Sequence, residues 1–158
     1  ERLRRAAATD ILLDMMFGPS SEFYLKNYEN GIISGKFGKS FESMADIACI
    51  LFSGAADDPD KVYAAIREEI EKRQREGFTE EEFNRAKKVF YTATLSHFDS
   101  TEDVANSFLS FLFDGGNMFD YPTTVAETTL EYATECFRRD FDISRSAISV
   151  ILPIEKQD

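Results

Sequence analysis

The stretch over residues 17–34, FGPSSEFYLKNYENGIIS, most constrains the fold because it interrupts the chain twice. Apolar residues recur at helical spacing over 2–17, and Pro19 ends that helix since proline cannot continue the hydrogen-bond ladder. A serine then caps a second, short helix that runs to about Asn30, and Gly31 supplies the left-handed backbone that ends it. The pattern predicts a long helix, a sharp break and a short helix before the first strand.

The rest of the chain indicates many helices and few strands. Asp58 and Thr79 are predicted N-caps, and Glu82 completes a capping box with Thr79. Strands are predicted over 36–43, 46–54 and 146–152, and helices over 59–76, 80–98, from residue 100 to Gly115, and once or twice within 122–141. The fold class that we expect is α/β in two layers (α+β), a mostly antiparallel sheet covered by helices on one face.

Two features of the strands extend this expectation. The segment 46–54 is so apolar that it is predicted to lie centrally in the sheet, with Cys49 as a buried thiol. The strand around Phe37 and Phe41 is predicted at an edge. It either accepts an extended peptide by main-chain pairing or pairs with a strand that precedes residue 1.

Length and charge limit the function classes. With 158 residues the chain is expected to form a single domain over 1–158, and its net charge of -11 argues against nucleic acid and membrane-surface partners. Two cysteines without CxxC spacing indicate neither a disulfide framework nor a zinc site, so the cytoplasm is the expected location. Because the sequence opens at Glu1 inside a helical pattern, we expect a fragment of a longer protein.

No residue cluster predicts catalysis or metal binding by this chain alone. His97 is the only histidine, and it follows the apolar stripe of Phe83 and Phe90, which indicates a core-edge histidine rather than a catalytic one. The acidic cluster around Asp58 lacks the spacing of a calcium loop, and helix capping explains it better.

Several strings, in their order and spacing, resemble the pitrilysin/insulinase family of zinc metallopeptidases, the inverzincins. They match the second half of these proteins, which binds no metal. The strings are Phe17-Gly18-Pro19-Ser20-Ser21-Glu22-Phe23-Tyr24, then Asn27-Tyr28-Glu29-Asn30-Gly31-Ile32-Ile33, then Asp58-Pro59-Asp60-Lys61-Val62, and Phe78-Thr79-Glu80-Glu81-Glu82-Phe83 with Ala86-Lys87.

The resemblance implies a fold of the mitochondrial processing-peptidase type. It also implies that the first half of such a protein, which is not this chain, would carry HxxEH and bind zinc. In active relatives this non-metal half supplies an arginine and a tyrosine that help hold the substrate carbonyl. Asn27 and Ser34 stand at those two positions here, so no catalytic residue is expected. Asn27, Tyr28, Ser34 and Phe37 are the candidate substrate-binding residues.

The function that follows is that of a C-terminal, non-catalytic half of a bacterial zinc-dependent peptidase. It would complete the peptide-binding chamber of a catalytic half on the same protein or on a paralogous subunit, with a peptide as substrate and a dimer as one assembly. Zinc is expected in the other half, and no cofactor in this chain. The alternatives are a structural subunit of the same fold that serves assembly, and an unrelated α/β binding module.

Overall fold

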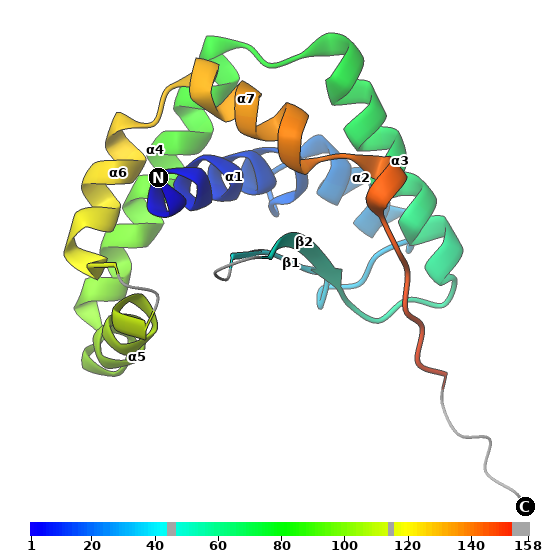
Figure 1. Cartoon of the computed structure of the whole chain (residues 1–158). Helices are drawn as coiled ribbons and strands as arrows, with labels where there is room; N and C mark the ends of the chain where they lie inside the picture. Colours follow the sequence, from blue (N-terminus) through cyan, green and yellow to red (C-terminus); the bar gives the residue numbers. More distant parts are fainter. Residues whose placement is uncertain (44–46, 114–115, 153–158) are drawn as a thin grey trace, which may run out of the picture.

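The computed structural model describes residues 1–43, 47–113 and 116–152. Most of them are helical (Figure 1). In chain order the elements are α1 (Arg2–Phe17), α2 (Glu22–Glu29), β1 (Gly38–Ser43), β2 (Ala48–Ser53), α3 (Pro59–Glu76), α4 (Glu80–Ser96), α5 (Thr101–Phe113), α6 (Tyr121–Glu127) and α7 (Leu130–Asp140), with short 3₁₀ turns η1 (His97–Asp99), η2 (Met118–Asp120) and η3 (Ile143–Arg145).

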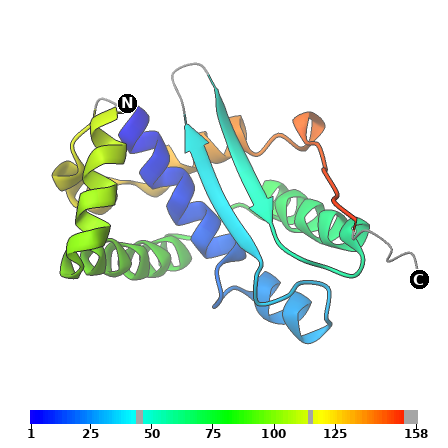
Figure 2. The ribbon, with the colours of Figure 1, turned by 90° about the horizontal axis from the view of Figure 1, so that it is seen from below.

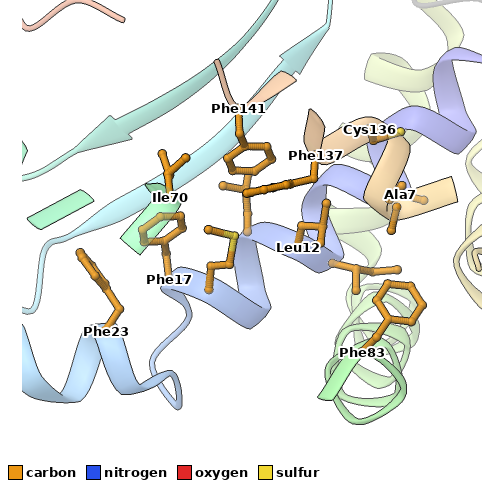
Figure 3. Packing of buried hydrophobic residues seen from close by; sticks show 14 of the residues in the cluster. Ala7, Leu12, Phe17, Phe23, Ile70, Phe83, Cys136, Phe137 and Phe141 are labelled. Atoms are coloured by element: carbon orange, nitrogen blue, oxygen red, sulfur yellow. The ribbon is translucent and has the colours of Figure 1, made fainter. Parts of the chain in front are cut away.

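Helix α1 is the centre of the molecule. It packs against β1 on one side and against α4, α6 and α7 on others (Figure 1). Half of its residues are buried: Ala7, Ala8, Thr9, Ile11, Leu12, Leu13, Met16 and Phe17. Phe83 of α4 and Phe137 of α7 complete this core from the neighbouring helices (Figure 3). The α1 side chains face several elements at once, so this helix is buried around most of its circumference.

The helix starts are the ones that the sequence predicts. Ser21 accepts a hydrogen bond from the Tyr24 amide at 3.1 Å, which caps α2. Asp58 does the same for α3 through the Lys61 amide at 3.2 Å. At α4 the predicted capping box is confirmed, because the Thr79 hydroxyl accepts from the amide of Glu82 while the Glu82 carboxylate accepts from the amide of Thr79.

The two strands form an antiparallel hairpin in which Gly38 is opposite Ser53 and Ser43 is opposite Ala48. Residues alternate between the two faces, so Ile50 and Phe52 point toward the core while Cys49 and Leu51 are exposed. The predictions of a central second strand and of a buried Cys49 are therefore wrong. A strand of mostly apolar residues can belong to a sheet with only one buried face, so that every second residue is exposed. Composition alone does not show which of the alternating residues are buried.

The predicted strand over 146–152 is also wrong. These residues run extended but belong to no ladder in the part of the chain that the structure describes, and Ile151 and Leu152 are exposed. The segment is attached at its start, where the Tyr63 and Ser146 hydroxyls lie 2.7 Å apart, and it then leaves the body of the molecule (Figure 1). Apolar alternation specifies the two faces of a strand, whereas a strand also requires a neighbour for its backbone groups.

The architecture confirms the expected class, an α/β fold with an antiparallel sheet packed against helices. No helix among the described residues is both long enough and apolar enough to cross a membrane.

Candidate functional site

The candidate residues lie where α2 ends and the chain turns toward β1. Helix α2 is fixed on the body from two sides. Phe23 packs edge-on against Phe17 with ring centroids 4.8 Å apart, and Lys72 of α3 donates a hydrogen bond of 3.1 Å to Glu22. That bond holds the pKa of the Glu22 carboxyl below its usual value. The start of α2 is therefore held by both apolar and charged contacts.

Tyr28 and Phe37 belong to one row of aromatic rings. Tyr28 stacks on Tyr24 with centroids 5.9 Å apart, Tyr24 meets Phe37 at 6.4 Å, and Phe37 stacks on Phe52 at 6.0 Å. We call Tyr28, Tyr24 and Phe37 the aromatic row. It runs from Tyr28, which is 53% exposed, to the half-buried Phe37 at the edge of the core. The row joins a surface ring to the hydrophobic core.

Asn27 lies apart from that surface. The residue is only 6% exposed, and its side-chain amide nitrogen donates to the Phe23 carbonyl at 2.8 Å. Its own carbonyl accepts from the amides of Ile32 at 2.8 Å and Ile33 at 3.2 Å. Asn27 thus closes the end of α2, and its amide is already occupied by a neighbouring main-chain oxygen.

Ser34 connects two loops. Its hydroxyl donates to the Ala55 carbonyl at 2.9 Å and accepts from the Lys36 amide at 3.3 Å. Gly31 permits the turn before it with a φ of +68°, a left-handed conformation that favours glycine. The structure therefore brings Tyr28 and Phe37 together through Tyr24. The Asn27 side chain bonds within α2, and the Ser34 side chain bonds to the loop after β2.

Tyr24 is the member of this site that the sequence interpretation missed. Its signal is the spacing of four residues to Tyr28, which places both rings on one side of a helix. Together the rings offer an apolar surface next to the first strand, whose main-chain groups can pair with an extended segment. The arrangement suits binding of a chain by stacking and main-chain contacts.

Two candidates elsewhere have different outcomes. His97 is exposed in η1, because α4 ends at Ser96, so its predicted place at the edge of the core is wrong. Asp58 caps α3, as the sequence predicts.

Residues that would fit zinc are not found in the described part of this chain. Over 1–43, 47–113 and 116–152, no group of three or more His, Cys, Asp or Glu side chains could hold a metal ion. Zinc sites need three or four such ligands. No zinc-dependent step is therefore assigned to these residues.

This chain is similar in sequence to a zinc protease and in fold to an M16-like peptidase. A curated relative is the uncharacterized zinc protease YmfH of Bacillus subtilis, 26% identical over 153 residues, which are 97% of this chain and 36% of YmfH. A crystal structure of an M16-like peptidase from Alicyclobacillus acidocaldarius has a TM-score of 0.79 and 24% identity over 86% of this chain and 33% of that chain.

A second structure, the inactive peptidase domain of a zinc protease from Bordetella parapertussis, has a TM-score of 0.71 and 18% identity over 89% of this chain and 80% of that one. This chain thus spans about a third of the length of YmfH and of the Alicyclobacillus protein. The model of the family described as the Peptidase M16 inactive domain matches residues 1–90, which is more than half of the chain, and the chain belongs to this family.

Proposed function

We propose that this chain is the non-catalytic, C-terminal half of a bacterial zinc peptidase and that it closes a peptide-binding chamber against a catalytic half. The observation that carries the proposal is the surface between α2 and β1. It presents the exposed ring of Tyr28, stacked on a half-buried tyrosine, beside a strand. The amide of Asn27 is occupied by the Phe23 carbonyl. Such a surface binds a peptide without activating water or polarising its carbonyl.

The partners follow from this assignment. A zinc ion bound by an HxxEH half would activate water, and that half would lie on the same polypeptide or on a paralogous subunit. The whole of 1–158 would act as one domain, in the cytoplasm, with the aromatic row facing the peptide. The similarity to YmfH, an uncharacterized zinc protease, supports such a parent.

A structural role in assembly is the second candidate. It is favoured by Asn27 and Ser34, because both side chains already donate to main-chain carbonyls of this chain. The alternative of an unrelated α/β module is wrong, since the family model covers most of the elements that carry the site.

The test combines this chain with the HxxEH half from the same organism and measures zinc-dependent cleavage of a fluorogenic peptide. We expect cleavage only when both halves are present, and a several-fold increase in KM for Tyr28→Ala. Leu25→Ala is the matched control, because Leu25 lies on the same helix and is 51% exposed, close to the 53% of Tyr28. Equal cleavage with and without the chain would overturn the proposal, and equal KM values for the two variants would favour the structural role.

A further inference from the structure

Helix α5 is apolar, yet none of its side chains is buried among the described residues. Four of them form a continuous exposed group, which we call the α5 face: Phe108 at 45% exposure, Leu109 at 49%, Leu112 at 56% and Phe113 at 85%. The helix lies at one end of the molecule, and the segment 146–152 lies at the other (Figure 2). Large apolar side chains in a contiguous group on a protein surface mark an interaction site.

Helix geometry shows that α5 has more apolar surface than the body of the molecule can cover. At 3.6 residues per turn, the arc from Phe111 through Phe108 to Phe113 spans about 200° of the helix circumference. Among the described residues, the body meets one edge of that arc, where the Phe111 ring packs against Tyr121 at 5.5 Å between centroids. Helices with so wide an apolar arc are normally buried on two sides.

Charge distribution indicates what kind of partner covers the α5 face. The chain carries a net charge of -11, but the sequence over 104–113, VANSFLSFLF, contains no charged residue. Charged residues are depleted from the cores of interfaces, and permanent interfaces are more apolar than transient ones. A permanently attached partner therefore fits the α5 face better than a substrate that must leave.

A second run of exposed apolar side chains lies on the extended segment 146–152 and not on a helix face: Ile148, Val150, Ile151 and Leu152. On the other helices, exposed apolar side chains are scattered. Leu25 on α2 and Val89 on α4 are as exposed as the members of the α5 face, but they lie on separate helices. Single exposed apolar residues are ordinary on protein surfaces.

We propose that the α5 face is the surface on which the catalytic half docks; this rests on the function proposed above. The relatives contain further polypeptide that could cover the α5 face, because 64% of YmfH and 67% of the Alicyclobacillus protein lie outside the parts that match (100 - 36 and 100 - 33). A second copy of this chain is disfavoured, since it would bring together two bodies of charge -11 each. The docked half would cover Leu112 and Phe113 and leave the aromatic row to the peptide.

The experiment measures the dissociation constant of this chain for the HxxEH half of the same organism by isothermal titration calorimetry. The variant is Leu112→Glu with Phe113→Glu. Its matched control is Leu25→Glu with Val89→Glu, which also converts two exposed apolar residues to glutamate and changes the net charge equally. We expect the first variant to weaken binding at least 100-fold and the control to weaken it less than 3-fold.

The outcomes separate this inference from the proposed function. If the variant Leu112→Glu with Phe113→Glu binds the HxxEH half as tightly as the wild type does, and peptide cleavage is retained, the α5 face is not the docking surface. The proposed function would still stand. Absence of both binding and cleavage with the wild-type chain would overturn the proposed function and the docking surface with it.

Two controls complete the design. Circular dichroism of both double variants must match the wild type, and Phe108→Ala serves as a milder third variant, for which we expect about a tenfold weakening. Light scattering of the chain alone reports its mass. If the wild-type chain is a dimer and the variant Leu112→Glu with Phe113→Glu is a monomer, the α5 face binds a second copy and the proposal is overturned.

Discussion

Helices α1 and α5 are both rich in apolar residues, and they differ in what covers them. Helix α1 has eight buried residues and contacts β1, α4, α6 and α7, whereas α5 has no buried residue and contacts mainly the short turns η1 and η2. An apolar helix gains stability only from the surface that it removes from water. Helix α1 obtains that gain within this chain, and α5 would obtain it from a partner.

The comparison separates folding from assembly. Substitutions around α1 are expected to change the free energy of unfolding of the chain, and substitutions on α5 to change association with little effect on folding. Four substitutions test this separation.

The largest effect is expected for Phe83→Ala. Phe83 of α4 is fully buried in the α1 core (Figure 3), and truncating a buried phenylalanine costs about 3–5 kcal/mol in lost contacts and cavity formation. Urea denaturation followed by circular dichroism measures the loss. A change below about 1 kcal/mol would show that α1 does not depend on α4 for its covering.

Arg5→Met is expected to cost about 1.5–3 kcal/mol at neutral pH, the range for a hydrogen bond to a charged group. The Arg5 guanidinium donates two hydrogen bonds to Asp140 of α7, at 3.0 and 2.5 Å, and the Asp140 side chain is 4% exposed. Burial opposes ionisation of Asp140, but the bonds from Arg5 and Arg139 outweigh it and hold its pKa below the usual value.

The sign of the pH dependence follows from that lowered pKa. A carboxyl group with a lowered folded-state pKa contributes stability above its unfolded pKa of about 3.9, and that stability is lost as pH falls through the folded pKa. The difference between wild type and Arg5→Met should therefore be largest near pH 7 and shrink below pH 4. A difference that stays constant from pH 7 to pH 3 would rule out the ion pair as its source.

Asp10→Asn is expected to stabilise the chain at neutral pH, whereas Arg5→Met destabilises it. Burial raises the pKa of Asp10 to about 6, although the Tyr121 hydroxyl donates to it at 2.8 Å. The other charged groups that act on it are Lys39, Glu42 and Asp14. Because the folded protein binds this proton more tightly than the unfolded chain, wild-type stability falls as pH rises from about 4 to about 6.

An asparagine cannot ionise, and its carbonyl can still accept from Tyr121. The variant should gain on the order of 1 kcal/mol relative to wild type above pH 6 and nothing below pH 4. Thermal unfolding at pH 4 and pH 7 measures this crossover. Equal differences at the two pH values would show that Asp10 is not held in its protonated form.

The sequence predicts elements that have strong local signals. It does not predict burial or strand pairing where these depend on residues distant in the sequence. Residues such as Pro19, Asp58 and Thr79 act within one helical turn, so the bounds of α1 and α3 could be predicted. Cys49 and the segment 146–152 required knowledge of which sheet face is covered and which strand lies alongside. The site follows the same division. The family strings contain Tyr28 and the alternation of the first predicted strand gives Phe37, whereas only the ring distances join them through Tyr24.

Phe113→Ser should have the smallest effect on the isolated chain. Phe113 is 85% exposed, and surface substitutions away from packed contacts change the free energy of unfolding by less than about 0.5 kcal/mol. The same substitution should weaken binding of the HxxEH half, because there the ring would be buried against the partner. A loss of stability comparable to that of Phe83→Ala would show that α5 supports the fold rather than an interface. Little change in folding combined with weaker association would establish that the apolar surface of α1 serves this chain and that of α5 serves its partner.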